Sequence, residues 1–335
     1  MSSATQYYVS ALAIYACIDI MACWGLNLQF GVAGIYSFGF IAFQAVGAYT
    51  AGVLTLGPDT GPLSFQTYIG GAQLPFPVAV LCAGAAGAIL ALVVGAITFR
   101  RLRSDYQAMV MLTVALIATS IVVTQPKLVN GEAGLSLIPQ PYYAADASPV
   151  GYQWFYLGIT ALVTAIVFFV VHRVTRSPWG RSLRAMRDDD SVASALGKNV
   201  WAMRMIVFAI GGAIAAVSGA MLVAFIGAFS PSGWAYGETF VLFTALVIGG
   251  IGNNFGVAVG AVLVPLGLVE GTRFLPTIGR IGLNDELQWI CIGLLLLGFL
   301  WFAPRGLFPE RRRRLGARSE RPAWLPRILS RPEGP

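Results

Sequence analysis

Long runs of apolar residues, separated by short polar stretches, occupy most of the chain. Several runs reach or exceed about 18 residues, the length at which an apolar stretch predicts a membrane-spanning helix. A transmembrane β-strand would instead alternate apolar and polar residues over about ten positions, and these runs are continuously apolar. The pattern predicts an all-α integral membrane protein, a polytopic bundle of about ten (8–10) transmembrane helices. The runs lie at residues 8–23, 24–38, 39–56, 77–99, 105–125, 152–172, 203–227, 237–250, 255–273 and 286–303.

The first three runs are poorly separated, because glycines rather than charged residues mark their boundaries. Residues 7–56 hold either two spans and a broken piece or three short spans. We expect a transmembrane domain over residues 1–303, including a charged loop at 173–204, and a basic tail over residues 304–335. Composition agrees, since 11% of the residues are charged, against about 25% in a typical soluble domain. The 39 glycines suit helices whose backbones approach closely in lipid.

Lys and Arg residues are concentrated at 100–103, 173–204 and 305–331, which together hold 19 of the 22 basic residues. Cytoplasmic loops of membrane proteins carry an excess of Lys and Arg. Alternating spans place all three clusters on one side, so we expect a cytoplasmic C-terminus. Ten spans place the N-terminus inside and nine place it outside, and its first residues, which lack the basic segment of a signal peptide, do not decide. The basic tail suits contact with anionic lipid rather than with nucleic acid.

The charged loop at residues 173–204 reads RVTRSPWGRSLRAMRDDDSVASALGKNVWAMR. Ser177-Pro178 is a helix-start signal, with the serine as the cap and the proline in the first turn. Asp188 to Asp190 are placed to cap a second short helix, SVASALG, which ends at Gly197. We predict a helix pair that docks on a cytoplasmic motor protein, with a solvated basic loop as the alternative. The candidate docking residues are Arg181, Arg184, Arg187, Asp189, Asp190, Ala193, Ala195 and Gly197.

Two glycine-broken apolar segments are candidates for a solute pathway: GLNLQFGVAGIYSFGFIAFQAVGAYTAG at residues 25–52 and ALVIGGIGNNFGVAVGA at residues 245–261. A pair of such segments in the two halves of a chain is a sequence pointer to a translocation pathway. Tight helix packing is the alternative for both, and GNNFG also indicates an ordinary cytoplasmic turn. The candidate pathway residues are Asn27, Gly31, Gly34, Ser37, Gly39, Gln44, Gly250 and Asn253.

Residues suited to catalysis or metal binding are scarce. The four cysteines lie in apolar runs without histidine at metal-ligand spacing, and the single histidine, His172, ends a span. Asp19 is the deepest ionisable residue by position, with Glu238 and Glu270 nearer to span ends, and an intramembrane acid is by default a functional hypothesis. No GxxxxGK[ST] phosphate-binding motif occurs. We expect no catalytic residue, metal or cofactor in this chain, so any ATP that drives it binds another chain.

The motifs, taken in order, resemble a known family. The segment at 25–52 resembles the N-terminal signature of bacterial permease subunits of branched-chain amino acid ABC importers, and RSPWGRSLRAMRDDDSVASALGKNV resembles their cytoplasmic coupling loop. The segments IVFAIGGAIAAVSGAMLVAFIG, FSP, LVIGGIGNNFGVAVGA and FAPRGLFPE extend the resemblance over residues 25–310. The chain departs from the family at Phe40, where many relatives carry histidine or tyrosine, and at Ser191-Val192-Ala193, in place of the Glu-Ala-Ala of the general importer motif.

The resemblance implies a permease subunit of the second type in the bacterial inner membrane. It implies four partners, namely a homologous permease, two ATPase subunits that hold ATP and Mg²⁺, and a soluble substrate-binding protein. Residues 181–197 would lie against an ATPase, and residues 25–52 would help to line the pathway. The implied substrate is a branched-chain amino acid, with urea, short amides or aromatic acids as alternatives within the family.

Two readings outside the family follow from the residues alone. Asp19 favours an ion-coupled secondary transporter, which needs no ATPase. Asp188 to Asp190 favour a membrane enzyme that holds Mg²⁺ and a diphosphate, although such sites need several converging carboxylates and no second acidic cluster accompanies these three.

Overall fold

The computed structural model describes residues 3–58, 66–100, 104–143, 148–234, 236–270, 283–303 and 306–310. Helices dominate these residues, and the extended pairing among them consists of two isolated bridges, Tyr68 with Val129 and Leu135 with Phe229. The expected all-α membrane architecture is confirmed by five helical spans that are long and apolar enough to cross a bilayer: Thr5–Val32, Phe76–Thr98, Tyr106–Thr124, Pro149–Arg176 and Val200–Ile226. Shorter apolar helices occupy Ile41–Thr55, Asn254–Gly267 and Trp289–Phe302.

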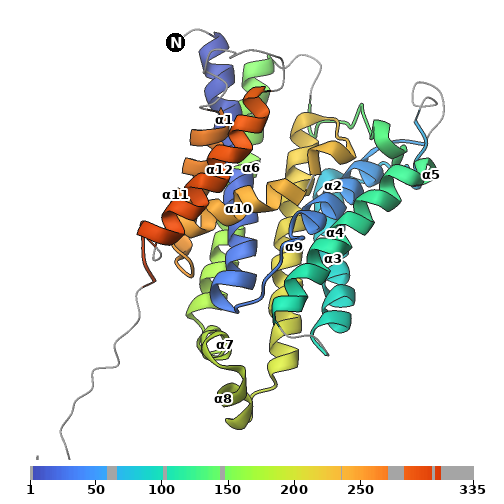
Figure 1. Ribbon diagram of the computed structural model, residues 1–335. Helices are drawn as coiled ribbons and strands as arrows, with labels where there is room; N and C mark the ends of the chain where they lie inside the picture. Colours follow the sequence, from blue (N-terminus) through green and yellow to red (C-terminus); the bar gives the residue numbers. More distant parts are fainter. Residues whose placement is uncertain are drawn as a thin grey trace, which may run out of the picture.

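The helices follow one another with few long connections (Figure 1). Those of the first half are α1 (Ser3–Leu26), the π-helix η1 (Asn27–Val32), α2 (Ile41–Thr55), α3 (Phe76–Thr98), α4 (Ser104–Thr124), α5 (Pro126–Val129), η3 (Gly131–Ala133) and α6 (Pro149–Arg176). Those of the second half are α7 (Pro178–Asp188), α8 (Asp190–Ala195), α9 (Val200–Ile226), η4 (Pro231–Trp234), α10 (Tyr236–Gly249), α11 (Asn254–Val262), the π-helix η5 (Leu263–Glu270) and α12 (Leu283–Phe302).

The N-terminal region contains two helices and a broken piece. Helix α1 continues without interruption into the π-helix η1, so the expectation of a separate apolar run at 24–38 is wrong. Glycine does not end the first helix at residue 25, because Gly25 packs tightly against the carbonyl of Gly211 instead. The break falls at Gly34, whose φ of +71° is readily adopted only by glycine. Irregular backbone then leads to α2 at Ile41.

Helix α9 is the most buried of the long helices, and α2 and α3 both pack along it. The contact depends on residues without a bulky side chain. A Cβ atom added at Gly47 of α2 would lie 2.0 Å from the Ala216 carbonyl oxygen, and one at Gly219 of α9 would lie 2.0 Å from the Gln44 carbonyl oxygen. On the other side, a Cβ atom at Gly87 of α3 would lie 2.4 Å from the Ala216 methyl group. Close backbone approach of this kind is how helices associate in lipid.

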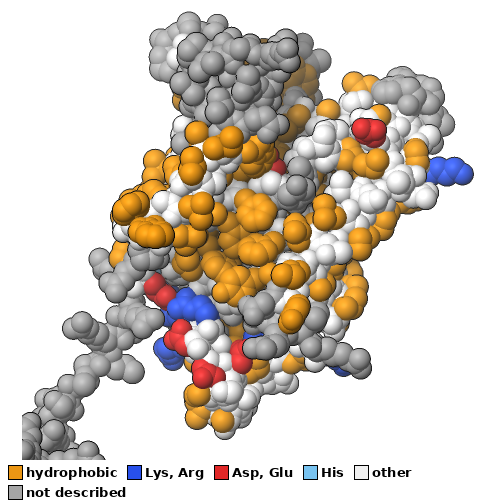
Figure 2. Space-filling model, in the orientation of Figure 1, with side chains coloured by type: hydrophobic (Ala, Val, Ile, Leu, Met, Phe, Trp, Pro, Cys, Tyr) orange, Lys and Arg blue, Asp and Glu red, His pale blue; other side chains and the backbone are white. Residues whose placement is uncertain are grey.

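Most charged side chains of the described residues gather at one end of the molecule. Helices α7 and α8 lie at that end, and the N-terminal end of α1 lies at the opposite end (Figure 1). Figure 2 shows acidic and basic side chains around α7 and α8, below a mainly hydrophobic face. Arg100 lies over the ring of Trp201, at 5.7 Å from its centre, and Arg187 lies 2.9 Å from Glu310. Arg100, the first residue of one basic cluster, and Glu310 therefore lie at the same end as the charged loop, and residues 101–103, 304–305 and 311–335 lie outside the described residues.

We predict that Gly47→Ala lowers the free energy of unfolding by about 1–3 kcal/mol, because the added methyl group forces α2 away from α9. Gly158→Ala on α6 is the matched control, since a Cβ atom at that position meets no other atom within 4 Å. Thermal unfolding of the two purified variants in the same detergent measures the difference. Equal melting temperatures would show that the α2–α9 contact is not close-packed.

Candidate functional site: the helix pair and the arginine junction

The charged loop folds into the two short helices that the sequence predicts. Helix α7 begins at Pro178, and the Ser177 hydroxyl oxygen caps it by accepting a hydrogen bond from the Gly180 N–H. Its apolar side, carrying Leu183 and Met186, is buried against the rest of the chain. The helix ends at Asp188, one residue before the cap of α8.

Helix α8 is capped by Asp189. The carboxylate accepts hydrogen bonds from the Ser191 hydroxyl at 2.6 Å and from the backbone N–H groups of Ser191 and Val192 at 2.8 and 3.1 Å. The bond from the Ser191 side chain, followed by these two backbone bonds, lowers the pKa of Asp189. The cap therefore stays ionised at neutral pH and is lost only as the pH falls through that lowered value. Gly197, at a φ of +76°, ends the pair.

The eight candidate docking residues do not share one environment. Four of them, Arg181, Asp189, Ala195 and Gly197, are exposed, and Ala193 is buried. Asp190 pairs with Arg204 at the start of α9. The remaining two, Arg184 and Arg187, turn toward the membrane helices.

Two exposed apolar residues, one in α8 and one directly after it, were not singled out from the sequence. Val192 and Leu196 are 55% and 73% exposed, and they form an apolar tip beside the exposed Ala195. Helical spacing of i and i+4 was the available signal, because it places both side chains on one face.

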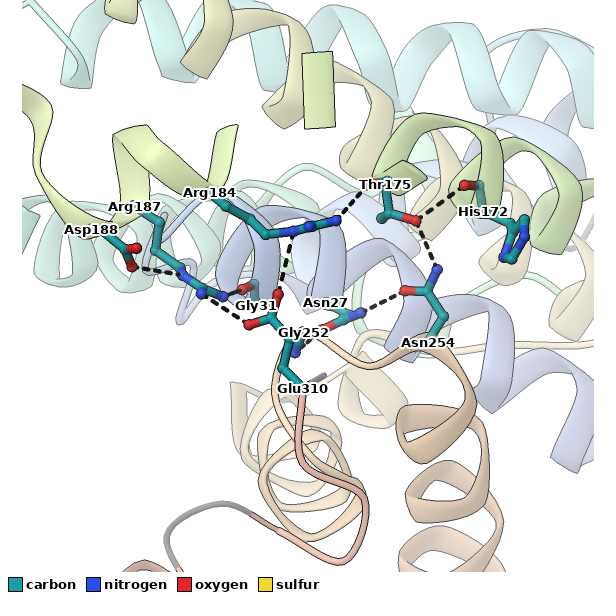
Figure 3. Close-up of polar contacts among 10 residues, drawn as sticks. All are labelled: Asn27, Gly31, His172, Thr175, Arg184, Arg187, Asp188, Gly252, Asn254 and Glu310. Atoms are coloured by element: carbon teal, nitrogen blue, oxygen red, sulfur yellow. Dashed lines mark hydrogen bonds and ion pairs between the residues drawn. The ribbon is translucent and has the colours of Figure 1, made fainter. Parts of the chain in front are cut away.

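The two inward arginines meet at what we call the arginine junction, formed by Asn27, Gly31, Thr175, Arg184, Arg187, Gly252, Asn254 and Glu310 (Figure 3). Arg187 donates to the carbonyl oxygen of Gly31 and pairs with the Glu310 carboxylate at 2.9 Å. The Arg184 Nε atom lies 3.3 Å from the other Glu310 oxygen, and its terminal nitrogen donates to the Thr175 carbonyl oxygen. One carboxylate thus holds two guanidinium groups, which suits the planar, multiple donors of arginine.

Asn27 links the two glycine-broken segments inside this junction. Its side-chain oxygen accepts a hydrogen bond from the Gly252 N–H at 2.9 Å, and its nitrogen donates to the Asn254 side chain at 2.9 Å. The Asn254 nitrogen in turn donates to the Thr175 hydroxyl at 3.1 Å. A chain of polar contacts therefore runs from η1 through the α10–α11 turn to the end of α6 (Figure 3).

The segment at residues 306–310 carries Glu310 into the junction. The N–H groups of Leu307 and Phe308 donate to the Ile248 and Gly249 carbonyl oxygens at 2.8 and 3.1 Å. The Asn253 side chain donates to the Phe308 carbonyl oxygen at 3.1 Å. A Cβ atom at Gly250, where φ is +115°, would lie 2.2 Å from that same oxygen. The sequence signal for this contact was FAPRGLFPE, which the resemblance included but to which no role was given.

The candidate pathway residues separate into three groups. Asn27, Gly31, Gly34, Gly250 and Asn253 lie in or beside the arginine junction, and Gly34 packs so closely that a Cβ atom would lie 2.8 Å from the Arg187 side chain. Ser37 and Gly39 are buried, and a Cβ atom at Gly39 would lie 2.1 Å from the Met111 carbonyl oxygen of α4. Gln44 lines a separate cavity of about 440 Å³.

A larger hollow of about 730 Å³ opens beside the junction. Asn253 and Asn254 line it together with Arg184, Glu310 and His172. Within the described ranges, no group of three or more His, Cys, Asp or Glu side chains is placed to hold a metal ion. What the junction offers is therefore a mechanical connection, in which α7 is joined to both glycine-broken segments and to the segment that ends at Glu310.

The sequence of the chain matches a known protein family. The profile of the family described as "Branched-chain amino acid transport system / permease component" matches residues 8–300. The chain belongs to this family. It is 28% identical to the Escherichia coli K12 high-affinity branched-chain amino acid transport system permease protein LivM over 325 residues, covering 91% of this chain and 71% of that protein. No solved structure shows significant similarity to the chain.

Two further relatives extend the comparison. The chain is 27% identical to the probable branched-chain amino acid transport permease protein LivM of Methanocaldococcus jannaschii, covering 90% of this chain and 94% of that protein. It is also 27% identical to the E. coli K12 permease protein LivH, covering 78% of this chain and 83% of that protein. The permease therefore resembles two differently named permease proteins of one organism.

We predict a coupling energy of about 1–2 kcal/mol between Arg187 and Glu310, because each charge is partly buried and each is left unpaired when the other is removed. A double-mutant cycle with Arg187→Met and Glu310→Gln, followed by thermal unfolding in detergent, measures it. The exposed Arg181 provides the control cycle, for which additivity within about 0.5 kcal/mol is expected. Additive effects in the Arg187 cycle would contradict the ion pair.

Proposed function

We propose that this permease is one transmembrane subunit of an ATP-driven importer for branched-chain amino acids in a bacterial inner membrane. Membership of the family and the similarity to LivM and LivH support the solute class. The observation that carries the mechanism is the arginine junction, since Arg187 of α7 contacts both Gly31 and Glu310. A helix pair at the charged end of the molecule is thereby attached to the segments where the transmembrane helices break.

In this proposal an ATPase subunit contacts the exposed tip of α8. Movement of α8 is passed to α7, because Asp189 is both the C-cap of α7 and the N-cap of α8. Arg187 then pulls on η1 through Gly31, and Asn27 passes the displacement to the α10–α11 turn through Gly252. The helix breaks are the points at which an inward-open and an outward-open arrangement would differ, as in transporters with discontinuous helices.

The topology is proposed from the same geometry. The positive-inside rule assigns the end that holds α7, α8 and Glu310 to the cytoplasm. The start of α1 lies at the other end (Figure 1), which supports an N-terminus on the outer side in this proposal. Termini on opposite sides require an odd number of crossings, so this topology has nine: the five long spans and the shorter helices α2, α10, α11 and α12.

The partners are proposed from the match to both LivM and LivH. A second, homologous permease completes the pathway, two ATPase subunits hydrolyse ATP, and a soluble binding protein delivers the amino acid on the outer side. The loops between α2 and α3 and between α4 and α6 lie on that side in the proposed topology.

The test of this function is reconstitution of the complete complex. Co-purified partners, placed in proteoliposomes with the binding protein, are expected to accumulate L-leucine only when ATP is supplied to the ATPase side. Uptake driven by an ion gradient without ATP would instead establish the ion-coupled reading. Accumulation of urea, amides or aromatic acids in place of leucine would show that the permease transports another class of substrate.

We predict that Leu196→Asp abolishes both recovery of the ATPase subunits and ATP-driven uptake, because a carboxylate replaces the most exposed apolar side chain of the α8 tip. Leu137→Asp is the matched control: Leu137 is 62% exposed and lies in the connection between α4 and α6, away from the charged end. Both variants are expected to reach the membrane in equal amounts. If the ATPase subunits are recovered normally with Leu196→Asp, α8 is not part of the surface that docks the ATPase.

A further inference from the structure

The cavity of about 440 Å³ lies among the transmembrane helices, away from the arginine junction. Its volume falls in the range of about 300–1,000 Å³ found for small-molecule sites. Six elements line it, namely α1, α2, α9, η4, α10 and the π-helix η5. Apolar side chains form much of the wall, and the main ones are Leu12, Ile41, Leu222, Val241 and Leu242.

Three polar side chains line this cavity: Asp19 is half-buried, Gln44 is buried and Glu238 is exposed. Gln44 is 4% exposed, yet its amide has no hydrogen-bond partner among the described residues. Neither acid forms a salt bridge within that part of the chain. An amide without a protein partner costs free energy unless a ligand or water satisfies it, and the cavity gives a polar molecule access to the Gln44 amide.

Asp19 stands near the middle of the span Thr5–Val32. With a rise of about 1.5 Å per residue, it lies roughly 20 Å from either end. Ionisable groups at this depth are expensive and are found where a cavity or a partner charge requires them. The described residues that line the cavity include no basic group, so none of them neutralises Asp19, and a cationic ligand would suit this wall.

We propose that this cavity is a solute-binding site in which Asp19 and Glu238 hold the ammonium group of the transported amino acid. The Gln44 amide N–H donates to the carboxylate of the same molecule, and the apolar wall receives its side chain. This inference rests on the proposed import function and adds the residues that select the solute. It distinguishes a zwitterionic amino acid from urea, neutral amides and anionic aromatic acids, since none of these brings an ammonium group to the two acids.

The first experiment compares uptake and motor activity in the complete complex. Asp19→Asn and Glu238→Gln are each expected to lower L-leucine uptake at least about ten-fold, the effect of losing one hydrogen bond to a charged group. ATP hydrolysis stimulated by the binding protein is expected to stay within two-fold of wild type. Gln107→Leu is the control, because Gln107 is 2% exposed but does not line this cavity.

The second experiment tests whether the cavity favours cations, by measuring labelling rates of a cysteine in it without any substrate. A cysteine introduced as Val241→Cys, with the four native cysteines replaced by serine, reports access. The cationic reagent 2-aminoethyl methanethiosulfonate is expected to react about ten-fold faster than the anionic 2-sulfonatoethyl reagent. The rate ratio is expected to approach one in the Asp19→Asn, Glu238→Gln background.

The outcomes separate this inference from the proposed function. A wild-type complex that imports leucine, with variants that import it equally well, overturns the site alone. Equal labelling rates for the two reagents overturn it as well. A wild-type complex that imports no branched-chain amino acid overturns the proposed function, and preferential cationic labelling in that complex still supports a cation-selective cavity for another amine.

Discussion

Every backbone N–H and C=O group at membrane depth needs a partner within the protein, because lipid offers none. An unbroken helix meets this requirement by itself, but the helices break after η1 and between α10 and α11, toward the charged end of the molecule. At both breaks, polar side chains from elsewhere supply the partners: Arg187 satisfies the Gly31 carbonyl group, and Asn27 satisfies the Gly252 N–H. The unpaired backbone groups at each break bond to side chains from other segments. These bonds join the two breaks to each other and to α7.

The rest of the packing follows a different principle. Along α9, contact with α2 and α3 rests on glycine and alanine, and a single added methyl group has no room at Gly47 or Gly87. Such contacts are rigid, since they allow neither sliding nor rotation without collision. The arginine junction is instead made of a few directional bonds beside a hollow of about 730 Å³. The molecule thus combines a tightly packed group of helices with a polar connection that has space around it, which is the combination that movement between two arrangements requires.

The local features of the charged loop were predictable from sequence, and its long-range contacts were not. Ser177, Asp189 and Gly197 act within a few residues of their own position, so cap and turn preferences were sufficient to place the two helices. The inward orientation of Arg184 and Arg187 depends on Glu310, which lies 123 residues beyond Arg187. The three-residue spacing of Arg184 and Arg187 puts both on one broad face of a helix, but the spacing does not indicate what that face contacts. Likewise, the position of Asp19 in its apolar run indicates an acid within the membrane. That Gln44 and Glu238 line the same cavity is visible only in the structure, where six elements enclose it.

The close fit of Gly34 against Arg187 has a consequence for how this permease can evolve. Gly34 holds a backbone conformation that favours glycine, and it leaves room for the arginine stem and for nothing larger. Arg187 in turn pairs with Glu310, so the three positions form an epistatic unit across distant parts of the gene. A substitution at one of them is harmful in a background that keeps the other two, and becomes tolerable only after its neighbours have changed. Drift at this site is therefore expected to proceed by linked replacements, whereas the exposed residues of α8 are free to adapt one at a time to a different motor.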